Sequence, residues 1–237
     1  MSTKKLPVLK LPVHQLTLPV SNQKIEIKPY VIKEETSFLT MLNTEKEEDI
    51  VLAFKKLIEN CVLTENFSID DLTFVDFCYL ILFIRIKSSS EILELKQHCE
   101  ECEAENEFEI NIEDSIKFEN LENSKLIVII SNILTFEIVP PKFSTMLEIE
   151  KIKNEVEQLM YIISSCVSKV VYSEEIFADF TKEELTENIL NLLTKKQLEK
   201  ISEASAKLPN MFIEFKFICQ KCQHENKRKI ENVRNFF

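Results

Sequence analysis

The sequence contains no glycine and no tryptophan among its 237 residues. The lack of glycine has the larger consequence, because phosphate-cradling loops, dinucleotide-binding turns and the nucleophile elbows of hydrolases all depend on its backbone freedom. These classes of enzyme are therefore excluded. Histidine is also rare, with three in the chain, and no serine or cysteine stands in a readable catalytic motif. We expect a protein that is not an enzyme.

Positive charge is in short supply as well. The formal net charge is −11 at pH 7, whereas a protein that binds nucleic acid without sequence preference normally presents a basic face. That class is disfavoured. The one basic cluster, Lys227–Lys229, is interpreted as the solvated face of a strand rather than a phosphate contact.

Long hydrophobic runs are missing too. The nearest, Phe74–Ile86, is interrupted by Asp76 and Arg85 and is shorter than the roughly 18 apolar residues of a membrane span. The N-terminus is rich in lysine and proline and lacks the apolar segment of a signal peptide. We therefore expect a protein that is made and kept in a cytoplasm and has no membrane partner.

What the sequence does contain is a local pattern that occurs twice. Each copy is an alternating apolar and polar run, a Cys-x-x-Cys pair, a Glu-Asn dipeptide and then an isoleucine. The pairs are Cys99 with Cys102 and Cys219 with Cys222. The pattern predicts a strand, a metal-binding knuckle and a return strand in each copy.

The two pairs together predict one structural zinc ion. Two thiolates separated by two residues can bind one metal, and a tetrahedral zinc site needs two such pairs. Redox or disulfide chemistry and unligated cysteines are the competing interpretations, and the absence of a signal peptide or regular disulfide framework disfavours the former. His98 and His224 flank the pairs and could replace a thiolate, although a surface position is favoured.

The other three cysteines lie among apolar residues and are expected to be small core side chains. They are Cys61, Cys78 and Cys166.

The N-terminal segment carries Leu-Pro-Val three times, at Leu6, Leu11 and Leu18. Proline at this density removes backbone donors and favours extended chain. We expect residues 1–22 to form an arm that lies in a groove of its own chain or of a neighbouring subunit.

The remaining patterns predict an α+β fold. We expect a helix-rich body with small antiparallel β elements and a zinc-ribbon-like module that joins the middle of the chain to its C-terminus. A helix at about 74–87, apolar nearly all round, should be the buried central helix. Two β-rich runs, 126–130 and 134–139, should form a hairpin.

The chain is expected to divide into five regions. These are the arm at 1–22, a strand plus helical region at 23–90, the first knuckle at 91–115, the hairpin with a long helix and short helices at 116–208, and the second knuckle at 209–237.

The long helix is expected to span Ser144 to about Tyr172. Its apolar residues step by three and four, which is the pattern of a helix that packs lengthwise along another helix, in the same subunit or in a partner. The seam consists of Ile149, Ile152, Val156, Leu159, Ile163, Cys166 and Val170.

Taken in order, four features resemble the baseplate hub proteins of T-even-like contractile-tailed bacteriophages. They are the Leu-Pro-Val arm that leads into an Ile-x-Ile-x-Pro strand, the helix that opens with Leu72-Thr73-x-x-Asp76 and ends in Arg85, the strand before the first cysteine pair, and the second pair followed by Asn235-Phe236-Phe237. Knuckles of that family commonly read Cys-Pro-x-Cys-Gly. Here Glu100 and Gln220 stand at the proline positions, and Glu103 and Gln223 stand at the glycine positions.

The resemblance implies a non-enzymatic structural or assembly protein that is used while the central hub of a phage baseplate is built. It would act through other baseplate or tail proteins in the host cytoplasm during assembly, and in the tail baseplate of the virion if it stays in the particle. It implies no small-molecule substrate. The alternatives are a zinc-ribbon protein that binds nucleic acid or the transcription machinery, and a thiol oxidoreductase with a reactive Cys99 or Cys219. The candidate partner contacts, which include self-association through the long helix, are Leu6, Leu11, Leu18, Ile149, Ile152, Val156, Leu159, Ile163, Phe236 and Phe237.

Overall fold

The computed structural model describes residues 9–43, 47–149 and 151–230. The helices are α1 (Ile32–Leu42), α2 (Glu47–Cys61), α3 (Phe74–Ser88), α4 (Ile112–Ser115), α5 (Phe143–Ile149), α6 (Glu155–Cys166), α7 (Lys182–Asn188) and α8 (Lys195–Ser205). The strands are β1 (His14–Thr17), β2 (Lys24–Ile27), β3 (Ile92–His98), β4 (Glu105–Asn111), β5 (Ile116–Glu119), β6 (Leu126–Ile129), β7 (Leu134–Ile138), β8 (Val167–Tyr172), β9 (Glu175–Phe177), β10 (Asn210–Ile218) and β11 (Glu225–Ile230). All described strand pairs are antiparallel, so the predicted α+β class is confirmed.

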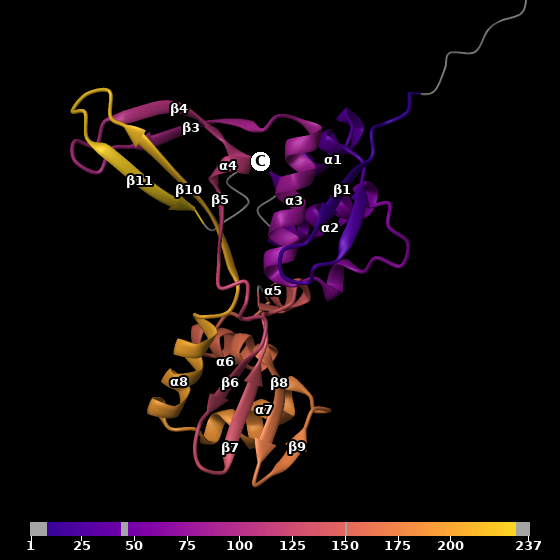
Figure 1. Cartoon of the computed structure of the whole chain (residues 1–237), viewed down its shortest axis with the longest axis vertical. Coiled ribbons are helices and arrows are strands. Elements are labelled where there is room, and N and C mark those ends of the chain that lie inside the picture. Colours follow the sequence, from indigo (N-terminus) through magenta and orange to yellow (C-terminus); the bar gives the residue numbers. More distant parts are fainter. Residues whose placement is uncertain (1–8, 44–46, 150, 231–237) are drawn as a thin grey trace, which may run out of the picture.

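The described chain is built around two hydrophobic cores. The first core gathers β1, β2, helices α1 to α3 and the inward side chains of β10. The second core lies between the sheet β6-β7-β8-β9 and helices α6 to α8. Figure 1 shows the second core as a lower lobe, from which β10 rises past β5 to the upper part of the molecule. Among the described residues, no helix is long and apolar enough to cross a membrane.

Helix α3 is the buried central helix, as predicted. Its first turn is capped by the Thr73 hydroxyl, which accepts a hydrogen bond from the Asp76 backbone N–H at 3.1 Å. Most of its side chains are buried, and Leu80, Ile81 and Ile84 are fully so. A helix that is apolar all round needs cover on every side, which the N-terminal hairpin, α2, α5 and β10 supply.

The N-terminal arm is only partly as predicted. From His14 the chain forms β1, which pairs with β2, so the expected boundary at residue 22 falls inside a hairpin. Leu18 is fully buried in the first core of its own chain, whereas Leu11 is partly exposed. The proline content predicted an extended arm as far as residue 22. Pro19, however, lies in the turn after β1 and does not interrupt the strand. Leu6 lies outside the described residues.

The prediction of one long helix over 144–172 is wrong. Helix α5 ends at Ile149, and α6 begins after Asn154, whose side chain caps the backbone N–H groups of residues 156 and 157. The end of the segment, Val167–Tyr172, forms β8, because its β-branched residues pair with β7. The heptad seam therefore does not exist: Val156 and Leu159 are exposed, while Ile163 is buried in the second core.

The lower lobe extends the predicted hairpin of β6 and β7 into four strands. Phe136 points into the second core and is fully buried. On the opposite face of the sheet, Ile127, Ile129 and Ile176 are each more than 60% exposed. In the register, Ile129 and Ile176 lie at the two ends of one row, with Thr135 and Val171 between them. An antiparallel sheet with one solvated face normally carries polar side chains there; this face has Thr135, Glu137 and Lys169 but also the three exposed isoleucines.

Candidate metal centre

Two hairpins carry the cysteine pairs. In the first, β3 and β4 pair from Ile92–Asn111 to His98–Glu105, and in the second, β10 and β11 pair up to Ile218–Glu225. Figure 1 shows the hairpins side by side in the upper left, although the chain between them builds the whole lower lobe. The ring of Phe108 stacks on that of Phe217 with centroids 4.5 Å apart. This aromatic contact joins the two hairpins independently of any metal.

The two knuckles have the same backbone hydrogen bonds. The N–H of Cys99 donates to the carbonyl of Ala104, and the N–H of Glu103 donates back to Cys99. In the second copy, Cys219 pairs with His224, and Gln223 donates to Cys219. The repeat recognised in the sequence is therefore a repeat in backbone structure as well.

Glu103 and Gln223 have left-handed backbone conformations, with φ angles of 57° and 62°. This conformation costs a residue with a Cβ about 1–2 kcal/mol and is free of steric penalty for glycine. The two residues stand at the positions where the family that this sequence resembles commonly has glycine. The knuckle geometry is thus kept without glycine, at some cost in stability.

Replacing Glu103 by glycine should therefore stabilise the protein by roughly 0.5–1 kcal/mol, because the relief of backbone strain exceeds the added entropy of the unfolded chain. Chemical denaturation of the metal-loaded protein measures this. Glu101→Gly is the matched control, since Glu101 is in the same turn but is not among the residues with positive φ, and it should destabilise. Equal losses in the two variants would contradict the account.

The four sulfur atoms of the knuckles come together. All lie within 4.8 Å of one another, and two pairs across the hairpins, Cys99 with Cys222 and Cys102 with Cys219, are each 3.6 Å apart. A zinc ion bound tetrahedrally at about 2.3 Å from each thiolate places the sulfurs about 3.8 Å apart. A disulfide needs about 2.05 Å. The spacing fits a shared metal ion and not a disulfide.

The two flanking histidines, for which a surface position was favoured, do not join the cluster, whose members are the four cysteines. His98 and His224 are both exposed. The Nδ1 atom of His98 lies 3.1 Å from the carbonyl oxygen of Glu103. Among the described residues, the candidate ligand set is therefore four sulfurs.

The thiols of the cluster differ in acidity. The backbone N–H of Cys222 is the main cause that lowers the pKa of Cys219 to about 6. The pKa of Cys222 is raised to about 12, because desolvation and the neighbouring sulfurs outweigh the backbone N–H of His224 that lowers it. Four thiolates at this spacing repel one another, and a divalent cation among them would remove that repulsion.

Two residues in contact with the cysteines were not recognised as functional from the sequence. Asn106 and Asn226 are buried and reach the sulfurs of the opposite knuckle. The signal was present, because the same Glu-Asn dipeptide follows each cysteine pair, but a repeat alone does not show which way a side chain points.

The basic cluster behind the second knuckle is neutralised by neighbouring acids. Lys227 pairs with Glu214 at 2.6 Å, and Arg228 pairs with Glu100 and donates to the His98 carbonyl. Lys229 lies 3.8 Å from a carboxylate oxygen of Glu119. These contacts fit the solvated strand face that was predicted and leave little positive charge for a phosphate.

The remaining cysteines are buried in the two cores, as predicted. Burial raises the pKa of the Cys61 thiol to about 12 and that of Cys166 to about 11, and it raises that of Cys78 as well. Neutral, buried thiols are poor nucleophiles. These cysteines serve packing.

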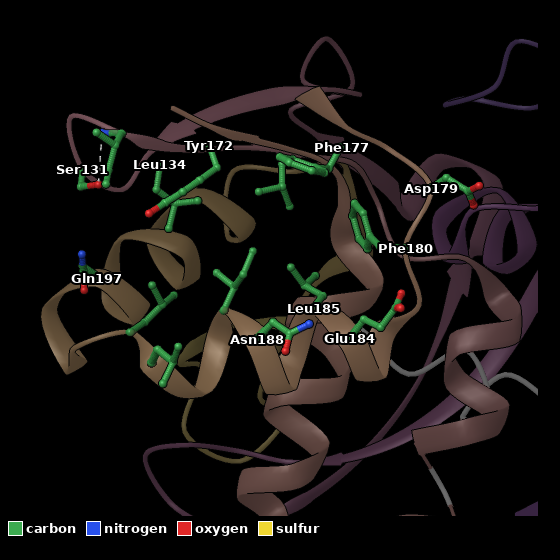
Figure 2. Close-up of a pocket in the computed structure, with 15 residues that line it drawn as sticks. Ser131, Leu134, Tyr172, Phe177, Asp179, Phe180, Glu184, Leu185, Asn188 and Gln197 are labelled. Atoms are coloured by element: carbon green, nitrogen blue, oxygen red, sulfur yellow. Dashed lines mark hydrogen bonds between the residues drawn. The ribbon is translucent and has the colours of Figure 1, made fainter. Parts of the chain in front are cut away.

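The lower lobe holds an open groove of about 620 Å³ between the sheet and helix α7. Figure 2 shows Leu134, Tyr172 and Phe177 on the sheet side and Leu185 on the helix side, with Asp179 and Glu184 at one end. No lysine or arginine is among its lining residues. Leu192, also in the lining, is 76% exposed. The groove offers a mainly apolar surface with two carboxylates at one end.

Comparison with known families gives one result that covers nearly the whole chain. The model of the family described as T4 bacteriophage base plate protein matches residues 11–237. No curated protein and no solved structure matches the chain. The matched region includes both knuckles and both cores, so the chain belongs to the family of T4 bacteriophage base plate proteins.

Proposed function

We propose that this protein is a non-enzymatic structural or assembly component of the central hub of a phage baseplate, held together by one structural zinc ion. The observation that carries the zinc assignment is the spacing of the four sulfurs, which fits a tetrahedral ion. Family membership supports the baseplate assignment. The protein would work in the host cytoplasm during assembly and in the tail baseplate if it stays in the particle.

A zinc ion in this site would have four protein ligands and no open position for water or substrate. The zinc ion would therefore contribute to stability and not to a chemical reaction. Cys102 and Cys219 are separated by the whole lower lobe, so the site closes a long loop and fixes the ends of that loop against each other. A rigid connection between the two hairpins suits a part that must present its surfaces at fixed angles.

The surfaces that would contact other tail proteins lie mainly on the lower lobe. The apolar groove and the isoleucines of the outer sheet face are exposed on the same four-stranded sheet. Exposed apolar side chains in such numbers are typical of protein interaction sites. Leu11 is a further candidate, being 38% exposed. Phe236 and Phe237 remain candidates but lie outside the described residues.

The alternatives receive less support. A zinc-ribbon protein that binds nucleic acid would need free positive charge near the knuckles, where Lys227, Arg228 and Lys229 are paired with acids. A redox Cys-x-x-Cys pair normally begins a helix and acts alone, whereas here two pairs meet at the tips of hairpins.

The proposal is tested by recovering a tagged copy of the protein from infected cells and identifying what comes with it. We expect baseplate proteins in the recovered complex. Recovery as a free monomer throughout infection would contradict the assembly role.

The groove gives this experiment a sharper form. Leu192→Glu places a charge in the groove without disturbing a core, because the side chain is already 76% exposed; its effect on stability should stay within about 0.5 kcal/mol. We expect recovery of partner proteins to fall at least about tenfold, since a charge buried at an apolar contact costs more than the 1.4 kcal/mol that this factor represents. Leu63→Glu, at an exposed position outside the groove, is the matched control. Equal recovery with both variants would exclude the groove as a contact.

A further inference from the structure

The two asparagines beside the cysteines make reciprocal contacts between the hairpins. Asn226 follows the second pair, yet its Oδ1 accepts a hydrogen bond from the backbone N–H of Glu100 at 2.9 Å, in the first knuckle. Its Nδ2 lies 3.5 Å from the sulfur of Cys99 and 3.1 Å from the carbonyl oxygen of His224. One side chain therefore links both knuckles.

Asn106 repeats these contacts in the opposite direction. Its Oδ1 accepts from the backbone N–H of Gln220 at 2.9 Å, its Nδ2 lies 3.7 Å from the sulfur of Cys219, and the same Nδ2 donates to the Ala104 carbonyl at 2.8 Å. Each hairpin thus inserts one asparagine into the other. The arrangement is an internal twofold relation between the two copies of the sequence repeat.

Burial makes these contacts specific. Asn106 is 3% exposed and Asn226 is fully buried, and a buried amide is unfavourable unless its donors and acceptor are satisfied. Both amides reach their partners in the opposite hairpin only when the hairpins are docked in this one arrangement. A slipped or rotated arrangement would leave polar atoms buried without partners.

The contacts also separate the four sulfurs into two classes. The asparagines donate to Cys99 and Cys219, which are 2% and 0% exposed, respectively. Cys102 is half-buried and Cys222 is exposed. Hydrogen bonds from outside the ligand set typically orient metal ligands and govern how firmly the metal is held.

We infer that Asn106 and Asn226 are positioning residues that clasp the two knuckles together and shield the inner sulfurs, so that metal exchange begins at Cys102 and Cys222. This inference rests on the proposed zinc site. In this role the asparagines slow the release of the metal without binding it, and they do more than support the fold.

The test measures how fast the zinc-loaded, full-length protein transfers its metal to a colorimetric chelator. Asn226→Asp is the sharpest variant, because a carboxylate keeps the acceptor for the Glu100 N–H but cannot donate to the Cys99 sulfur. Transfer should be about 10–100-fold faster than in the wild type. Asn106→Asp supplies the same comparison from the other hairpin if Asn226→Asp does not fold.

A second readout separates positioning from mere stabilisation. In the cobalt-substituted protein, loss of a hydrogen bond to a thiolate should shift the sulfur-to-metal charge-transfer band to lower energy, whereas a loss of stability elsewhere would leave the band in place. Asn123→Ala is the control, since that side chain donates to the Lys207 carbonyl away from the knuckles. It should change neither the transfer rate nor the band.

The metal content of the wild type is read first. A wild type that binds no zinc overturns the proposed site itself. A wild type that binds zinc, with asparagine variants that release it at the wild-type rate and leave the cobalt band unchanged, overturns only the inference about the asparagines.

Discussion

Removing the metal from the purified protein should lower its melting temperature by more than about 10 °C. Structural zinc contributes about 10–16 kcal/mol of binding free energy in small zinc domains. If even about 5 kcal/mol of this stabilises the present fold, the shift follows, because each kcal/mol moves the melting temperature of a chain of this size by about 2–4 °C. Cys219→Ser should have a similar effect, since it leaves three ligands and an incomplete site. Thermal melts with and without a chelator measure both.

The loss should be local at first. The second core includes no residue of the knuckle hairpins, so the sheet of the lower lobe should keep its protection in hydrogen exchange while β11 loses it. Limited proteolysis should then cut within the C-terminal hairpin. Cys61→Ala is the control, because it removes a buried thiol that is not part of the cluster and should leave the metal in place. Unchanged melting and unchanged protease resistance after metal removal would contradict this expectation.

The second large effect is expected at Asp76, in the first turn of the central helix. Its carboxylate is fully buried and accepts the backbone N–H groups of Val20 at 2.8 Å and Ser21 at 3.0 Å. Asp76→Ala would leave both N–H groups without this acceptor and remove a favourable charge at a helix N-terminus. We expect a loss of about 3 kcal/mol, measured by chemical denaturation.

Asp70→Ala is the matched control for this prediction. Asp70 pairs with Lys55 at 2.9 Å on the surface, with its side chain half-exposed, and such pairs contribute less than about 1 kcal/mol. Asp76→Asn should fall between the two variants, because its amide oxygen still accepts one hydrogen bond. A loss at Asp76 no larger than that at Asp70 would show that the N-terminal hairpin is held by its apolar contacts alone.

Features that depend on neighbours in the chain were predictable. The caps at Thr73, Thr181 and Thr194 each sit where the sequence places a hydroxyl three residues before its partner. The hairpin of β6 and β7 and the two knuckles likewise follow from local runs and turns. The four-cysteine cluster follows in turn, because two matched pairs have few other ways to be satisfied.

Features that depend on distant partners were not predictable. The heptad spacing across 149–170 is present in the sequence, but the partner that decides the outcome is β7, which draws Val167–Tyr172 into a sheet. The burial of Leu18 likewise depends on a core assembled from later helices. The role of Asn106 and Asn226 depends on how the hairpins face each other, which no local pattern states.

Native mass spectrometry of the purified protein, prepared without added metal, tests the central claim most directly. The account predicts the mass of the chain plus about one zinc ion, with Cys99, Cys102, Cys219 and Cys222 resistant to alkylation until a chelator is added. A metal-free mass together with rapid alkylation of all four cysteines in the native protein would contradict it.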